Sequence, residues 1–247
     1  MRYQRAWWAG AAILAAITTG ACRNTRETGT VTSKTSAGTS TTPSSENLEN
    51  RELAEVRVIN AIPGEAVTVY AGDSAAFSGV AYKSATKWHE IPNNLFDFKL
   101  LSGGPGSKAL AENRENLHGG GHYTIVALPD QGGADKRNLR VLDDDLKPVS
   151  PGKARVRFIN GVPSDQDVDL YLSGRDDALF DGVNFKKEAG WDDFDPMAGS
   201  LSVRPDNKTN VLASLHNVKL EGGKSYTFVL TGKAGKYELV KIEDEVS

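Results

Sequence analysis

The segment Ala54-Glu-Val-Arg-Val-Ile-Asn-Ala-Ile-Pro63 recurs one hundred residues later as Ala154-Arg-Val-Arg-Phe-Ile-Asn-Gly-Val-Pro163, with six of the ten residues identical. Further stretches match in the same order, namely Val67–Tyr70 with Val168–Tyr171, Phe77–Tyr82 with Phe180–Phe185, Trp88 with Trp191, Leu117–Val126 with Leu220–Val229, and Leu139–Leu142 with Leu239–Ile242. A period near 100 residues exceeds the roughly 20 to 50 residues of solenoid repeats. The repeat therefore predicts two tandem domains.

Each copy has the sequence pattern of an all-β domain. Short runs such as Val56–Ile59 and Tyr123–Leu128 are rich in β-branched and aromatic residues, and Gly, Pro, Asn and Asp separate them. About seven such runs per copy are typical of an immunoglobulin-like β-sandwich, and a small barrel is the rival architecture. We expect two tandem immunoglobulin-like β-sandwich repeats over residues 53–147 and 153–247, joined by a short proline-containing linker.

The N-terminus has the features of a secretory signal. Arg2 and Arg5 precede an apolar stretch that is too short to span a bilayer, and small residues follow it. Thr19-Gly-Ala-Cys22 resembles the lipobox of bacterial lipoproteins, although Thr19 stands where that pattern usually has Leu. We expect a signal peptide over residues 1–21, lipid attachment at Cys22, and a lipid-anchored position in the cell envelope, at the outer membrane if the host has one.

Residues 22–52 are expected to form a disordered tether behind the lipidated cysteine. The segment is rich in Ser and Thr and contains almost no large apolar side chain. Such a composition cannot bury enough surface to offset the entropy of ordering. A glycosylated stalk is the alternative for this kind of sequence.

Taken together, the two copies resemble the bacterial surface family catalogued as domain of unknown function 4397. The resemblance rests on Val156–Pro163, Val168–Tyr171, Gly223–Val229 and Val141–Asp145, and it covers roughly residues 54 to 245. It implies a secreted or envelope-attached β-sandwich module, often found in tandem, without established catalytic residues. The first copy departs from the pattern at Thr68, where the second copy has Asp169.

Residues that both copies keep are most simply explained by the shared scaffold. They are Arg57 and Arg157, Asn60 and Asn160, and Pro63 and Pro163. We expect a turn at the end of the strand, in which Asn bonds local backbone, Pro closes the strand and Arg projects outward. Tyr123 and Tyr226 are expected to hydrogen-bond back to the backbone, as in a tyrosine corner.

Two further shared residues, Trp88 and Trp191, have a packing and a binding interpretation. Half-buried packing is the simpler one. If both indoles were exposed on one face, they would become the best candidates for stacking on sugars.

The histidines are poor candidates for catalytic or metal-binding residues. His118-Gly-Gly-Gly-His122 superficially resembles the oxyanion loop of esterases, but the chain has no Gly-x-Ser-x-Gly motif. The glycines oppose a helix, so these two histidines cannot form an i, i+4 zinc pair. We expect a plain glycine turn and no metal site.

Acidic residues gather in three places. Asp165, Asp167 and Asp169 form the first group, and the others are Asp192–Asp195 and Asp143–Asp145. Closely spaced carboxylates suit calcium, but none has the spacing of a twelve-residue calcium loop. Solvated loops are the simpler interpretation, and a calcium or partner site specific to the second copy is the alternative.

The net charge and the cysteine content argue against two classes of protein. Twenty-nine basic and 32 acidic side chains give a net charge of −3, which does not favour nucleic-acid binding, and a single cysteine excludes a disulfide framework. We expect a non-catalytic binding or structural protein with no cofactor, attached to the membrane by lipid and partnered by an envelope protein or a glycan. The alternatives are a calcium- or glycan-binding adhesin-like protein and, less favoured, a carboxylate-dependent hydrolase.

Overall fold

A computed structural model describes residues 52–132, 136–144, 146–164 and 166–244. The predicted signal peptide, Cys22 and all but the last residue of the predicted tether lie outside these residues, as does Asp165. The described residues contain sixteen strands and no helix, so none of them forms an apolar helix long enough to cross a membrane. Both repeats belong to one compact unit of the chain.

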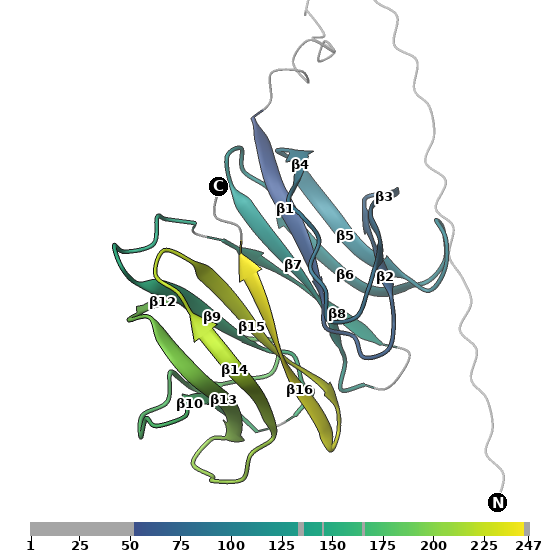
Figure 1. Ribbon diagram of the computed structural model, residues 1–247. Coiled ribbons are helices and arrows are strands. Elements are labelled where there is room, and N and C mark those ends of the chain that lie inside the picture. The colour runs from purple at the N-terminus through teal and green to yellow at the C-terminus, as the bar shows by residue number, and fades with distance from the viewer. Residues whose placement is uncertain (1–51, 133–135, 145, 165, 245–247) are drawn as a thin grey trace, which may run out of the picture. The chain divides into compact units, whose positions relative to one another are not determined.

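The first repeat is a sandwich of two four-stranded sheets (Figure 1). Its strands are β1 (Leu53–Asn60), β2 (Val67–Ala71), β3 (Ser74–Val80), β4 (His89–Pro92), β5 (Leu95–Leu101), β6 (Ala109–Asn116), β7 (His122–Pro129) and β8 (Arg137–Asp143). One sheet has the order β4-β1-β7-β8 and the other the order β3-β2-β5-β6.

The second repeat has the same topology. Its strands are β9 (Ala154–Asn160), β10 (Val168–Leu172), β11 (Phe180–Val183), β12 (Glu188–Phe194), β13 (Met197–Pro205), β14 (Ala213–Leu220), β15 (Ser225–Lys233) and β16 (Lys236–Asp244). The sheet orders are β12-β9-β15-β16 and β11-β10-β13-β14. The predicted all-β class and the two sandwiches are thus confirmed, and the small barrel was wrong.

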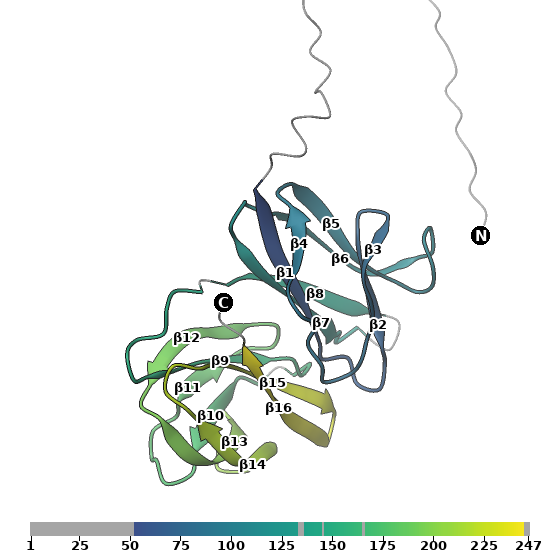
Figure 2. The ribbon, with the colours of Figure 1, turned by 45° about the horizontal axis from the view of Figure 1, so that its top comes forward.

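The central strands of one sheet in each repeat run parallel. β1 pairs with β7 and β9 pairs with β15, and Figure 2 shows each pair side by side. The registers match, because Val58 lies opposite Ile125 and Phe158 lies opposite Phe228. The remaining pairs in these sheets are antiparallel.

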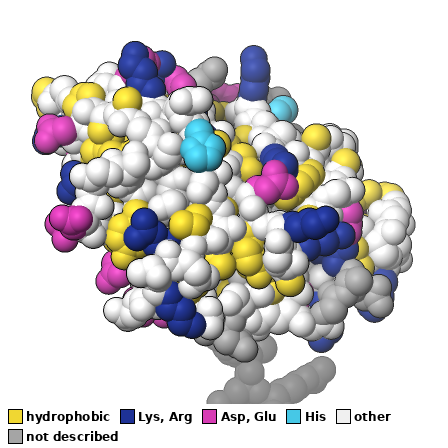
Figure 3. Space-filling model, turned by 60° about the horizontal axis from the view of Figure 1, so that its bottom comes forward, with side chains coloured by type: hydrophobic (Ala, Val, Ile, Leu, Met, Phe, Trp, Pro, Cys, Tyr) yellow, Lys and Arg dark blue, Asp and Glu magenta, His cyan; other side chains and the backbone are white. Residues whose placement is uncertain are grey.

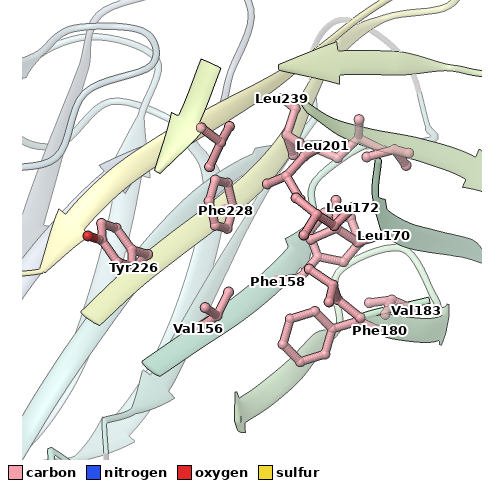
Figure 4. Packing of buried hydrophobic residues seen from close by; sticks show 14 of the residues in the cluster. Val156, Phe158, Leu170, Leu172, Phe180, Val183, Leu201, Tyr226, Phe228 and Leu239 are labelled. Carbon is pink, nitrogen blue, oxygen red and sulfur yellow. The ribbon is translucent and has the colours of Figure 1, made fainter. Parts of the chain in front are cut away.

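Each sandwich has its own apolar core. In the second repeat, Figure 4 shows Phe158 and Phe228 from one sheet packed with Leu170 and Leu201 from the other. All four side chains are fully buried. The first repeat has the equivalent core around Val58, Val69, Phe98 and Ile125. Burial of these side chains supplies the main favourable free energy of each sandwich.

Candidate functional site

The central strands are buried on both faces, which sets up an interface between the repeats. In β1, Val56 and Val58 point into the core of the first sandwich, so Arg57 and Ile59 point to the opposite face. A third apolar cluster covers that opposite face and draws on both repeats. Its buried members are Ile59, Ala61, Val126, Leu128, Leu142, Ile159 and Val229. We call this interface the seam.

Buried ion pairs cross the seam in both directions. Arg57 of β1 pairs with Asp244 at the end of β16, and Arg157 of β9 pairs with Asp144, which follows β8. The Nη1 atom of Arg157 lies 2.5 Å from Oδ1 of Asp144, and neither side chain is accessible to solvent. Each repeat therefore supplies one arginine and one carboxylate to the other repeat.

Two threonines at equivalent positions complete this network. Nε of Arg57 donates to Oγ1 of Thr124 over 2.9 Å, and Nε of Arg157 donates to Oγ1 of Thr227 over 2.9 Å. Thr227 in turn donates to Asp244 over 2.8 Å. The same contacts thus occur twice, related by an approximate twofold exchange of the repeats. A buried charge is tolerated only when it is paired and hydrogen-bonded in this way.

Arg57 and Arg157 do project outward from their own sandwiches, as expected, but they do not reach solvent. They are 3% and 0% exposed. Strand alternation does place them away from the sandwich core, but the other repeat covers that face. The sequence held one relevant signal: an arginine recurs between apolar residues in both copies.

The expected roles of two other shared residues are confirmed. Oδ1 of Asn60 accepts the backbone N–H of Ile62, and its Nδ2 donates to the carbonyl of Val80. Asn160 makes the corresponding bonds with Val162 and Val183.

The tyrosine prediction is also confirmed. The hydroxyl of Tyr123 accepts the backbone N–H of His118 over 3.0 Å, and the hydroxyl of Tyr226 accepts that of Glu221 over 3.0 Å.

Burial raises the pKa of two carboxyl groups that lie beside the seam. Desolvation raises the pKa of Asp244, against the opposing effects of Arg57 and Arg157. Desolvation likewise raises the pKa of Glu188, although its carboxylate lies 3.6 Å from Nη1 of Arg157. Both groups become costlier to ionise because water is excluded from them.

Trp88 and Trp191 cover the two seam arginines. The Arg57 guanidinium lies 4.5 Å from the centre of the Trp88 ring, and the Arg157 guanidinium lies 4.4 Å from the Trp191 ring. Both indoles are half-buried, which agrees with the packing interpretation. Cation–π contacts of this kind stabilise desolvated arginines. A role in sugar binding stays a prediction.

One groove lies at an end of the seam and is built by both repeats. It has a volume of about 600 Å³, and its walls include Ile62 and Pro63 from the first repeat and Val162 and Pro163 from the second. Arg137, which bonds Glu65 over 2.5 Å, adds a charged rim. The groove is aliphatic at its walls and polar at its edge, as ligand-binding clefts commonly are.

The predicted acidic group around Asp169 is arranged differently from the sequence order. Asp167 is half-buried, whereas Asp169 is only 1% exposed. Carboxylate oxygens of Asp169, Asp181 and Asp206 lie within 4.8 Å of one another. Asp169 accepts the backbone N–H of Gly182 over 2.9 Å. Sequence spacing could not show this group, because strand pairing in the β10–β11–β13 sheet assembles it.

Burial and the neighbouring carboxylates affect the acidity of Asp169. Desolvation, followed by the negative charges of Asp181 and Asp206, raises its pKa. The expected solvated loop was wrong for Asp169, which is buried on β10. The alternative, a calcium or partner site at Asp165, Asp167 and Asp169, stays a prediction.

The acidic residues at 192–195 were interpreted as a solvated loop, and this was wrong for Asp193. It lies on β12, where its carboxylate accepts hydrogen bonds from Arg155 and from both N–H and hydroxyl of Ser150. These donors lower its pKa to about 2. The antiparallel register places Asp193 opposite Arg155, which sequence spacing alone did not reveal.

The histidines do not converge on one site. His122 contacts Glu55 over 2.7 Å, and His216 lies 3.1 Å from the hydroxyl of Ser200 in the other repeat. A turn at Gly119–Gly120 joins β6 to β7, as the glycines predicted. Gly120 has φ +72, a conformation that glycine adopts without strain. On the face that Figure 3 shows, acidic, basic and apolar side chains are interspersed and no single kind dominates.

The fold and the seam define a tandem β-sandwich protein whose repeats are joined by an interface of buried charge. The chain belongs to the family described as Domain of unknown function (DUF4397), whose profile matches residues 54–171 and 155–247. This agrees with the tandem repeat. No match is found among the curated proteins.

Two solved structures are similar to parts of the chain. The C-terminal domain of AlgF from P. aeruginosa is 21% identical, with a TM-score of 0.30, over 38% of this chain and 99% of that one. A family CBM26 module of Amy13K from Eubacterium rectale, solved with maltoheptaose, is 13% identical, with a TM-score of 0.24, over 78% of this chain and 99% of that one.

Proposed function

We propose that the chain is a lipid-anchored protein of the bacterial cell envelope whose paired repeats form a non-catalytic binding head. The observation that carries the proposal is the aliphatic groove at the seam, because both repeats must be docked for it to exist. The buried ion pairs of Arg57 and Arg157 supply that docking. A preorganised groove loses little entropy on binding, which favours affinity.

The occupant that suits this groove is an extended segment of an envelope protein. Its described lining residues include prolines and branched aliphatic side chains but no aromatic ring, whereas sugar sites usually offer a ring for stacking. Pro63 and Pro163 are rigid walls for an apolar side chain, and the polar rim can bond the backbone of a bound segment. A protein partner therefore fits better than a glycan.

The anchor proposal rests on the sequence motif at Cys22. Two or more acyl chains hold a protein stably at a bilayer, whereas a single chain binds marginally. By the sorting habit of bacterial lipoproteins, Arg23 after the cysteine favours the outer membrane. Metabolic labelling with an alkyne fatty acid should mark the wild-type chain and not Cys22→Ala, and the labelled chain should fractionate with outer membrane.

The groove is tested in the cell with a photocrosslinking amino acid. Placed at position 163 in the groove, it should give one adduct of constant size. Placed at Gly104, an exposed turn position outside the groove, it should give none. Adducts of equal yield at both positions, or none at 163, would contradict binding through the groove.

A further inference from the structure

A second groove opens at another part of the seam, and its lining is basic. It has a volume of about 340 Å³. Its lining includes Arg57, Lys83, Ala85, Lys87 and Trp88 from the first repeat, together with Lys241 and Glu243 from the second. We call it the basic groove. Its size is at the lower end of the range for small-molecule sites.

Ala85 in this groove occupies the position that Glu188 has in the second repeat. Ala85 forms an antiparallel bridge with Ile59, and Glu188 pairs in the same sense with Ile159. A tryptophan follows three residues later in both copies. The two positions are therefore structurally equivalent, but one carries a methyl group and the other a carboxylate.

In the second repeat, Glu188 places its carboxylate beside the seam arginine. Its Oε2 lies 3.6 Å from Nη1 of Arg157, and the side chain is 28% exposed. The second repeat thus supplies a carboxylate of its own at this point. In the first repeat, the methyl group of Ala85 leaves the corresponding space open as the basic groove.

The seam arginine of the first repeat also lacks a hydrogen bond. Arg57 is 3% exposed, and its Nη2 makes no hydrogen bond, since the carboxylate of Asp144 is 3.8 Å away. By contrast, Nη2 of Arg157 donates to Thr124 over 3.1 Å. A buried charged donor without a hydrogen bond is costly. A negative charge held in the groove would offset part of that cost by electrostatic attraction to the guanidinium, without contacting Nη2 itself.

Lysines give the basic groove a positive potential. Lys83 pairs with Glu238. Lys87 is exposed, and Lys241 lies 5.0 Å over the Tyr226 ring. No described carboxylate forms an ion pair with Lys87 or Lys241. Glu243 is the one carboxylate among the described residues that line the groove, and it pairs with Lys224 over 2.7 Å. A concave surface whose charges are mostly positive concentrates anionic ligands.

We propose that the basic groove binds a small organic acid, whose carboxylate takes the place that Glu188 fills in the second repeat. Arg57 and the lysines supply the positive charge, and Ala85 supplies the room. A carboxylate suits these groups because charge-assisted hydrogen bonds from Arg and Lys to carboxylates are strong. The site is separate from the aliphatic groove and needs neither the anchor nor a protein partner.

Thermal unfolding of the full chain in detergent tests the site with three probes. At a concentration ten times its Kd for the basic groove, glutarate should raise the midpoint temperature of unfolding by about 3 °C. Glutaramide, the uncharged analogue of similar shape, should leave the midpoint unchanged. Sulfate at equal ionic strength should have less effect than glutarate, because it lacks the planar carboxylate geometry. No glutarate shift, or an equal shift with sulfate, would overturn the proposal.

Two variants at one position sharpen the test. Ala85→Glu rebuilds the arrangement of the second repeat, so it should raise the midpoint without ligand and abolish the glutarate shift. Ala85→Gln, matched in size, should not raise the midpoint. A glutarate shift that persists in Ala85→Glu would overturn the proposal.

Substitutions at the groove's surface do not depend on repacking the seam. Lys87→Gln and Lys241→Gln should each weaken glutarate binding several-fold in calorimetry. Lys208→Gln, at an exposed turn outside the groove, should leave it unchanged. Unchanged affinity in both groove variants would contradict the site even if both Ala85 variants failed to fold.

Discussion

Arg157 of the second repeat and Asp144 of the first form an ion pair from which solvent is fully excluded. Arg57 and Asp244 repeat the relationship in the opposite direction. Because each of these pairs joins residues from different repeats, separating the repeats would break both pairs and expose their four charges to solvent. The seam should therefore behave as part of the folded state of both sandwiches.

Removing one member of a pair should be costly. Arg157→Met leaves Asp144 buried without its partner, and we expect the free energy of unfolding to fall by about 3 to 5 kcal/mol. Urea unfolding of the full chain measures this loss. Lys153→Met removes an exposed pair with Asp195, and it should change stability by less than about 1 kcal/mol. Equal effects of the two substitutions would contradict the buried role of Arg157.

Replacing both members should restore part of the loss. In Arg157→Met with Asp144→Leu, no uncompensated charge remains and apolar groups fill the site. We expect this double variant to be more stable than Arg157→Met alone by at least about 1 kcal/mol. A double variant less stable than either single variant would show that the pair is not the main interaction of these residues.

Gly161 lies where the second repeat approaches the first. A Cβ atom there would lie 2.7 Å from the carbonyl oxygen of Leu230 and 3.0 Å from a methyl group of Leu128. Gly161→Ala should therefore destabilise the chain by about 1 to 3 kcal/mol through overpacking. Gly104 has open space at the same position, so Gly104→Ala is the matched control and should be nearly neutral. Thermal unfolding of both variants measures the difference. Equal midpoints for the two variants would show that the seam is not closely packed at Gly161.

Asp193 should stabilise the fold at neutral pH. Its pKa is lowered to about 2, so its contribution is present above the unfolded pKa near 3.9 and is lost as the pH falls toward 2. We expect Asp193→Asn to lose about 1 kcal/mol at pH 7, with the difference shrinking as the pH falls and vanishing only below about pH 2. Urea unfolding across this range measures it. A pH-independent difference would assign the effect to lost packing or hydrogen bonds.

The ionised carboxylate of Asp169 should have the opposite effect and destabilise the fold at neutral pH. Because its pKa is raised in the folded state, its ionisation costs stability as the pH rises through the unfolded value and beyond. Asp169→Asn keeps an acceptor for Gly182 and should be more stable than the wild type at pH 7. The gain should disappear below about pH 4. A less stable variant at pH 7 would contradict the cost assigned to this carboxylate.

The same pair of proteins tests the predicted ligand role of Asp169. Calcium binding there would appear as a calcium-dependent rise in the unfolding midpoint of the wild type. Asp169→Asn should lose that rise. No rise in the wild type would remove the calcium prediction.

The sequence repeat and its strand patterning were sufficient to predict two all-β sandwiches and the local roles of Asn60 and Tyr123. They did not predict the seam. Strand alternation shows that Arg57 and Arg157 point away from the core, but it cannot show whether solvent or another domain lies there. The group formed by Asp169, Asp181 and Asp206 was missed for a related reason, since strand pairing brings together residues distant in the chain. The Ala85 and Glu188 equivalence likewise required the observed register.

If the seam is part of the folded state of both sandwiches, the two repeats should unfold as one cooperative unit. Differential scanning calorimetry of the full chain tests it most directly. We expect a single transition, with equal calorimetric and van't Hoff enthalpies, that separates into two transitions in Arg157→Met. Two independent transitions in the wild-type chain, neither of them shifted by Arg157→Met, would contradict it.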